Sequence, residues 1–235
     1  MAVSPWQFKN VNSSSGSWVS YSDTLFALRF QELVNGVIQP DMIELLTWND
    51  YGESHYLRKL PSQSESAPDY IIYSNGMENY VQGFNHNPWR IMAKYYIAWW
   101  KTGNKPAINQ DQVVFWYRVH PAAATCSEQP GVTISGSQYP VDAVFAWALV
   151  QSPATIEMDV GSNKNWTFTA DGSGPVLNMV PFPKTIPSGG ITPAVKIVRN
   201  GNVVQQNSGS LPISATCDWY NFNPVVTLAG TGVNA

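Results

Sequence analysis

The sequence predicts an α/β region over residues 1–105, followed by an all-β region over residues 106–235 that is built as an antiparallel β-sandwich. Before residue 105, two strong helical patterns alternate with strand-like runs. After it the helical period disappears, and short β-rich segments follow one another between turns. Alternating strands and helices are typical of a parallel sheet, whereas many short strands between turn residues are typical of a sandwich.

The α/β region is expected to begin with a strand over residues 3–6 and an amphipathic helix. Ser22 and Asp23 are expected to cap this helix, and Gly36 lies just past its end. Its apolar residues recur at helical spacing and form one face: Leu25, Phe26, Phe30, Leu33 and Val34.

A second helix is expected to begin with Asn87 as its N-cap and Pro88 at its first position, and to stop at Gly103. Aromatic residues dominate its apolar face: Met92, Tyr95, Tyr96, Trp99 and Trp100. Between the two helices, residues 42–48 form a short, mostly apolar run after Pro40. This run predicts a strand that is buried on both faces in a parallel sheet.

The all-β region contains six apolar segments with strand character: residues 113–119, 141–149, 154–160, 166–170, 195–199 and 225–228. Asn200 and Gly201 separate the fifth segment from residues 202–204. An Asn-Gly pair at this position predicts a two-residue β-hairpin turn.

The low charge of the chain indicates neutral partners. The formal net charge is -3, and charged residues make up 12% of the chain, against roughly 25% in typical soluble domains. The basic residues form no run, so neither nucleic acid nor an anionic membrane surface is expected as a partner. No apolar stretch approaches the ~20 residues that span a bilayer, and the N-terminal residues lack a signal-peptide pattern.

Two cysteines and two N-glycosylation sequons leave the compartment open. One disulfide between Cys126 and Cys217, with glycans on Asn12 and Asn165, would fit a secreted protein. Two buried free thiols are the alternative.

The stretch TWNDYGESHY, residues 47–56, places Asp50 and Glu53 after a predicted parallel strand, where α/β proteins carry their chemistry. A turn at Tyr51 and Gly52 would bring both carboxylates into one cavity, with Gly52 permitting the turn. One protonated and one ionised carboxyl group are the minimum machinery for cleaving a glycosidic bond. Neither a metal nor a cofactor is required.

Two other readings of the acidic stretch stay open. Asp50 could cap a turn while Glu53 pairs at the surface with Arg58 or Lys59. His55 could orient Glu53, bond a sugar hydroxyl or be a plain polar neighbour. The three histidines are too far apart in sequence to favour zinc, and lipase, nucleotide-binding and redox motifs are absent from the sequence.

The acidic stretch and its surroundings resemble the fungal α-1,3-glucanases (mutanases) of glycoside hydrolase family seventy-one. The similarity includes VSPW and QPDMIELL before the stretch and HNPWRIMAKYYIAWWK after it. It continues through VVFWYRVHP, YPVDAVFAWALV, MVPFP and YNFNPVV, and so covers residues 3–228.

This resemblance implies that residues 1–105 are the C-terminal portion of a (β/α)8 catalytic barrel and residues 106–235 a β-sandwich accessory domain. A closed barrel takes ~250 residues, so the chain is expected to be part of a longer enzyme. The implied activity is that of an endo-α-1,3-glucanase that inverts the anomeric carbon, secreted or in the cell wall. The implied partner is α-1,3-glucan, with no cofactor, and the enzyme is expected to be monomeric at full length.

The resemblance also implies roles for individual residues. Asp50 and Glu53 match the proposed catalytic acids, with Glu53 as general acid and Asp50 as base or close electrostatic partner. An inverting pair keeps its carboxyl groups ~6.5–9.5 Å apart to admit water. The sugar site would be lined by Trp6, Trp48, Asn49, Tyr51, His55 and Tyr56. A secreted family favours a disulfide between Cys126 and Cys217, and no metal ligand is expected.

A second function comes from a different class. The chain could be a non-catalytic carbohydrate-binding or cell-wall protein that retains only a barrel remnant and a β-sandwich. The two acids distinguish these functions, because a binding protein has no need of two carboxyl groups with separated pKa values in one cleft.

Overall fold

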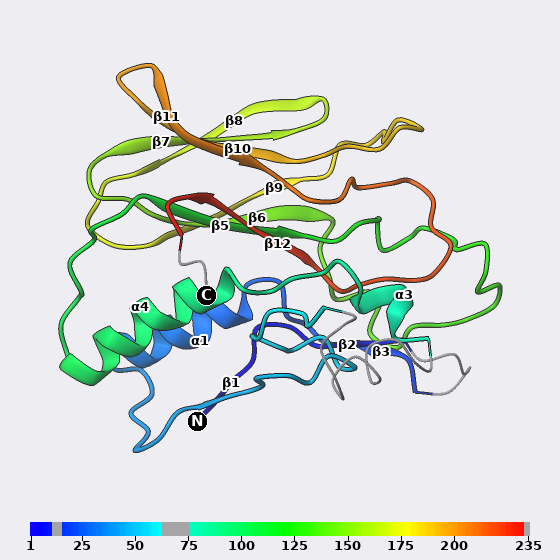
Figure 1. The fold of residues 1–235 in the computed structure, drawn as a ribbon, viewed down its shortest axis with the longest axis horizontal. Coiled ribbons are helices and arrows are strands. Elements are labelled where there is room, and N and C mark those ends of the chain that lie inside the picture. The colour runs from blue at the N-terminus through cyan, green and yellow to red at the C-terminus, as the bar shows by residue number, and fades with distance from the viewer. Residues whose placement is uncertain (11–15, 63–75, 233–235) are drawn as a thin grey trace.

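The computed structural model describes residues 1–10, 16–62 and 76–232. Two four-stranded antiparallel sheets lie one over the other, and helices α1 (Leu25–Val34) and α4 (Trp89–Thr102) form a third layer beneath them (Figure 1). The N-terminal segment runs below the helices. The all-β character predicted after residue 105 is confirmed.

The strands of the two sheets follow the predicted segments closely. The outer sheet has the order β11 (Asn202–Ser208), β10 (Ala194–Arg199), β7 (Ala154–Val160), β8 (Asn163–Ala170). The middle sheet has the order β12 (Val225–Gly230), β5 (Gln112–Tyr117), β6 (Ala143–Leu149), β9 (Val176–Pro181). Asn200 and Gly201, with φ of 50° and 77°, form the hairpin turn between β10 and β11. Strand β9 was not predicted.

The two central strands of the middle sheet, β5 and β6, are buried on both faces. Every residue of β5 and β6 is buried. One face packs against the outer sheet, and the other carries Trp116, Phe145 and Trp147 into a core shared with both helices. The Trp147 indole N–H donates to the Tyr96 hydroxyl of α4 at 3.1 Å, and the Trp116 indole N–H donates to the Asp23 carbonyl at 2.8 Å. The helices are therefore fixed to the sheet by packing and by hydrogen bonds.

Both predicted helices are present and end where their glycines predict. Gly36 and Gly103 have φ of 73° and 70°, a left-handed conformation that glycine adopts without strain. The helix α4 begins directly after Pro88. Phe30 of α1 stacks on Tyr96 of α4 with ring centroids 5.2 Å apart, which joins the two apolar faces.

The prediction that residues 42–48 form a strand buried on both faces is wrong. Only β4 (Glu44–Leu45) forms there, paired in parallel with β1 (Ala2–Val3). Met42 is 72% exposed and Trp48 is 56% exposed. Among the described residues β4 has one neighbouring strand, and the segment is only partly buried between its exposed residues Met42 and Trp48.

The described part of residues 1–105 is mixed α/β, but it contains no closed barrel. Besides the β1–β4 pair it holds a two-stranded antiparallel ladder and a short helix: β2 (Phe8–Lys9), β3 (Trp18–Val19) and α3 (Glu78–Val81). Within the described residues, no helix has the length and apolar character that a membrane crossing requires.

Candidate active site

The acidic stretch forms a loop whose two ends are tied together by the backbone. The N–H of Thr47 donates to the His55 carbonyl at 2.7 Å, and the N–H of Leu57 donates back to the Thr47 carbonyl at 3.0 Å. At the tip, the Glu53 carbonyl accepts the N–H of Phe8 at 3.0 Å. The loop is thus anchored at its base and held against β2 at its tip.

Asp50 organises the turn inside this loop. Its N–H donates to the Thr47 hydroxyl at 2.9 Å, and its Oδ1 accepts the N–H of Glu53 at 3.1 Å. This is the capping arrangement that Asp favours in turns, so the alternative prediction that Asp50 caps a turn is confirmed. The accompanying prediction of surface pairing is not confirmed, because the described residues show no ion pair between Glu53 and either Arg58 or Lys59.

Gly52 lies within the predicted turn, but it does not adopt a left-handed backbone conformation there. The left-handed residue of the loop is Ser54, with φ of 62°. Gly52 supplies space instead, because a Cβ there would lie 3.1 Å from the Met77 sulfur. Its carbonyl accepts the Tyr80 hydroxyl at 2.9 Å, so α3 packs closely beneath the loop.

Asp50, Glu53 and His55 converge at the surface of the loop. The Nε2 of His55 lies 3.0 Å from Asp50 Oδ2 and 3.8 Å from Glu53 Oε2. The side chains of Asp50 and Glu53 are 42% and 38% exposed, whereas that of His55 is 8% exposed. Two accessible carboxylates therefore lie over one buried imidazole.

The contacts of the buried imidazole with the two acids are close approaches rather than aligned hydrogen bonds. Although His55 Nε2 is close to Asp50, neither ring nitrogen makes an aligned hydrogen bond to any described residue. An oxygen of Asp50 and an oxygen of Glu53 lie within 4.8 Å of each other and of the ring nitrogen.

The predicted sugar-lining residues divide into accessible and buried groups. Trp48 is 56% exposed, with the Arg90 guanidinium 5.8 Å from its ring centroid, and Asn49 is also exposed. Trp6, Tyr51 and Tyr56 are at most 2% exposed, so their assignment as sugar-contacting residues is wrong in this structure. They belong to the apolar core under the loop.

Sequence reasoning missed Tyr80 as the residue that supports this loop from below. Burial raises the pKa of the Tyr80 phenol, and the nearby carboxylates of Asp50 and Glu53 raise it further, so the hydroxyl stays protonated and donates to Gly52. Tyr80 lies 28 residues beyond Gly52, and no local pattern marks it.

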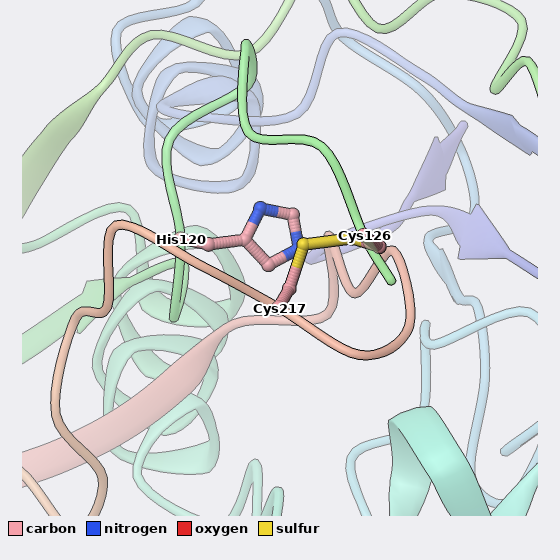
Figure 2. Close-up of side chains that lie close together, drawn as sticks. All are labelled: His120, Cys126 and Cys217. Carbon is pink, nitrogen blue, oxygen red and sulfur yellow. A yellow bond between two sulfur atoms is a disulfide. The ribbon is translucent and has the colours of Figure 1, made fainter. Parts of the chain in front are cut away.

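A second cluster of residue types that can bind a metal ion lies at the disulfide: His120, Cys126 and Cys217 (Figure 2). The structure joins Cys126 and Cys217 in a disulfide, the pairing that the resemblance predicts. Figure 2 shows the His120 ring beside it. The sulfurs are bonded to each other, so neither offers a thiolate, and His120 Nε2 already accepts the Asn221 N–H at 2.8 Å. This group is a structural cross-link.

Of the two predicted glycosylation sites, Asn12 and Asn165, the structure describes only Asn165. Asn165 is exposed on β8, where a glycan could be accommodated. Asn12 lies outside the described residues.

Comparison with known families assigns the chain. The sequence profile of Glycosyl hydrolase family 71 matches residues 1–234. The chain belongs to glycosyl hydrolase family 71. This confirms the family that the acidic stretch and its flanking motifs predicted.

Curated relatives carry names that agree with this family. A mutanase of Penicillium rubens is 31% identical over 99% of this chain, and a glucan endo-1,3-alpha-glucosidase of Schizosaccharomyces pombe is 33% identical over 94%. The ascus wall endo-1,3-alpha-glucanase of S. pombe is 27% identical over 94%. The chain spans about half the length of these relatives, 48%, 47% and 50% respectively. No solved structure matches it.

Proposed function

We propose that this family 71 chain carries the acid pair of an endo-α-1,3-glucanase, with Glu53 as general acid and Asp50 as its electrostatic partner and base. The observation that carries the proposal is the convergence of two accessible carboxylates over the His55 ring. Two curated relatives that match 94% of the chain are named for α-1,3-glucan cleavage.

The contacts of the two acids support different roles. Asp50 is held in place, with Oδ1 on the Glu53 N–H and Oδ2 beside His55. The carboxylate of Glu53 accepts no hydrogen bond from the described residues and has only the 3.8 Å contact with His55. A general acid must reach the leaving glycosidic oxygen, and the less constrained Glu53 suits that task.

The spacing of the pair bears on stereochemistry. Inverting enzymes keep the two carboxyl groups ~6.5–9.5 Å apart, whereas here an oxygen of each lies within 4.8 Å. We therefore expect Glu53 to turn away from Asp50 when glucan binds, which leaves space for water beside the fixed Asp50. The NMR anomeric signal of the first product tests this step, because inversion releases the β-anomer from an α-linked chain.

Substrate contacts are assigned to the accessible side of the loop. Trp48 offers an exposed aromatic face, and the Asn49 amide offers hydrogen bonds beside Asp50. His55 holds the two acids from beneath and does not touch the sugar. The protein is further proposed to be monomeric and extracellular or in the cell wall, with neither nucleic acid nor membrane as a partner.

The domain assignment belongs to the same proposal. Residues 1–105 would be the C-terminal portion of a (β/α)8 barrel that carries the acids, and residues 106–235 a β-sandwich accessory domain. The parallel pairing of β1 with β4, with the acidic loop following β4, supports the barrel assignment.

The test is a reducing-sugar assay on insoluble α-1,3-glucan, beside a pull-down on the same material. It is run with this chain and with a chimera in which the N-terminal half of the Penicillium relative precedes it. Asp50→Asn and Glu53→Gln should each keep binding and lower turnover by ~10²–10⁴-fold, because the amides preserve shape and remove only the proton chemistry.

Asn49→Ala is the matched control, since it alters the neighbouring exposed residue without touching either carboxylate. Its expected effect is a higher KM with little change in kcat. Near-normal turnover by both acid variants would refute the assignment. Glucan binding without hydrolysis, in both the chain and the chimera, would favour the non-catalytic carbohydrate-binding function instead.

A further inference from the structure

A groove of 470 Å³ lies in the described structure away from the acidic loop, at the disulfide-linked loops. Its lining includes Asn79 of α3 and a set of polar and aromatic side chains from the loops before and after the disulfide: Glu128, Ser214, Thr216, Asp218 and Trp219. Its volume falls within the roughly 300–1,000 Å³ that is usual for small-ligand sites.

The walls of this groove are cross-linked. Beside the Cys126–Cys217 disulfide, the N–H of Ser127 donates to the Cys217 carbonyl at 2.9 Å, and the N–H of Glu128 donates to the Asp218 carbonyl at 3.0 Å. The Ser127 hydroxyl also donates to Asp218 Oδ1 at 3.0 Å. A site held in this way loses little conformational entropy when a ligand binds.

Trp219 provides an oriented aromatic surface in the groove. The residue is half-buried, and its indole N–H donates to Glu128 Oε2 at 3.1 Å. This bond fixes the orientation of the ring. A pre-oriented indole suits the apolar face of a sugar ring, because large rigid side chains add contact area at low entropic cost.

The polar groups of the groove select for a neutral, hydroxyl-rich ligand. Asn79 and Thr216 are exposed, and together with Ser214, Glu128 and Asp218 they supply amide, hydroxyl and carboxylate groups that can donate to or accept from hydroxyls. The described residues that line the groove include no lysine or arginine, so phosphate, sulfate and polyanions lack a counter-charge among them.

The helix α3 contacts both this groove and the acidic loop. Asn79 lines the groove, while the neighbouring Tyr80 donates its hydroxyl to the Gly52 carbonyl of the loop at 2.9 Å. The short helix α3 therefore contributes a residue to each of the two sites. A polymer chain with many repeating units can occupy both at once, and its retention then benefits from two linked contacts.

We propose that the Trp219 groove is an auxiliary binding site for a chain of α-1,3-glucan, separate from the site of cleavage. The identity of the glucan rests on the proposed function. The site itself rests on the groove, the tethered indole and the uncharged or acidic lining.

Binding isotherms on insoluble α-1,3-glucan test this proposal in the Glu53→Gln background, where the glucan stays intact. Trp219→Ala should weaken binding about tenfold, the effect of losing a central aromatic contact of about 1.4 kcal/mol. Thr216→Tyr fills the groove from an exposed position that tolerates bulk, and it should weaken binding in the same direction. Trp166→Ala is the control, because Trp166 is 44% exposed on β8 outside the groove.

Hydrolysis of a short soluble α-1,3-oligosaccharide, with Glu53 intact, is the second readout and should be unchanged by Trp219→Ala. Binding by both groove variants within twofold of the parent, or an equal loss in Trp166→Ala, would overturn the proposal. Binding that depends on Trp219 in a protein that hydrolyses no glucan would remove the proposed function and leave the groove in place.

Discussion

Acidification from pH 7 to pH 5 is expected to destabilise this protein through His86. The ring is fully buried, stacks on Tyr56 with centroids 4.0 Å apart, and lies 3.2 Å from the carbonyls of both Tyr56 and Pro224. A charged ring could donate to both carbonyls, whereas a neutral ring donates to one. Burial outweighs this second bond and lowers the pKa of His86 from 6.5 to about 3.

The sign and size of the effect follow from this shift. A lowered histidine pKa means that the unfolded chain binds the proton first, so stability is fully present above pH 6.5 and is lost as the pH falls toward the folded pKa of about 3. Between pH 7 and pH 5 the loss from His86 is about 2 kcal/mol, at 1.36 kcal/mol for each pH unit over most of that interval. Burial also lowers the pKa of His120 to about 4, which adds a similar loss.

Urea denaturation at pH 7 and pH 5 checks this prediction. The parent should lose about 4 kcal/mol over that interval, and His86→Gln about 2 kcal/mol, because one of the two titrating rings is gone. Burial raises the pKa of Asp23, which acts with the opposite sign, but this acid affects both proteins equally. An NMR titration that placed the His86 pKa at or above 6.5, with equal pH dependence in both proteins, would refute the reasoning.

Two further predictions concern stability. Replacing Cys126 and Cys217 together by alanine should lower the free energy of unfolding by about 4 kcal/mol, because the disulfide closes a loop across a sequence separation of 91. Denaturation without reductant measures this, and a loss below about 1 kcal/mol would contradict it. Ser54→Gly should be tolerated whereas Ser54→Val should lose about 1–2 kcal/mol, because φ at this buried position is 62°. Equal melting temperatures for the two Ser54 variants would show that the backbone there carries no strain.

The sequence predicted those features that are determined by residues close together in the chain. The ends of both helices follow from Gly36 and Gly103, and the β10–β11 hairpin follows from Asn200 and Gly201, because each of these residues adopts a left-handed conformation. The convergence of Asp50 and Glu53 likewise follows from a short turn within one loop.

Features set by distant contacts could not be predicted in this way. An apolar run such as residues 42–48 looks the same whether it has neighbours on both sides or, as in the described residues, on one. Tyr56 is of a residue type that suits a sugar-binding site, but its hydroxyl contacts Phe84 and Asn223 in the core. Spacing also gave no sign that His55 would lie under both acids.

The double burial of β5 and β6 determines which changes in chain length this protein can accept. Along β5, Val113, Phe115 and Tyr117 pack toward the outer sheet, while Val114 and Trp116 pack toward the helices. Because side chains alternate between faces, inserting or deleting one residue here would exchange the contents of the two cores at once. A surface strand could recover from such a slip by exposing its mismatched face to water, but β5 has no face in water. Insertions should therefore accumulate in loops such as the one between β5 and β6, and the strands should keep a constant length.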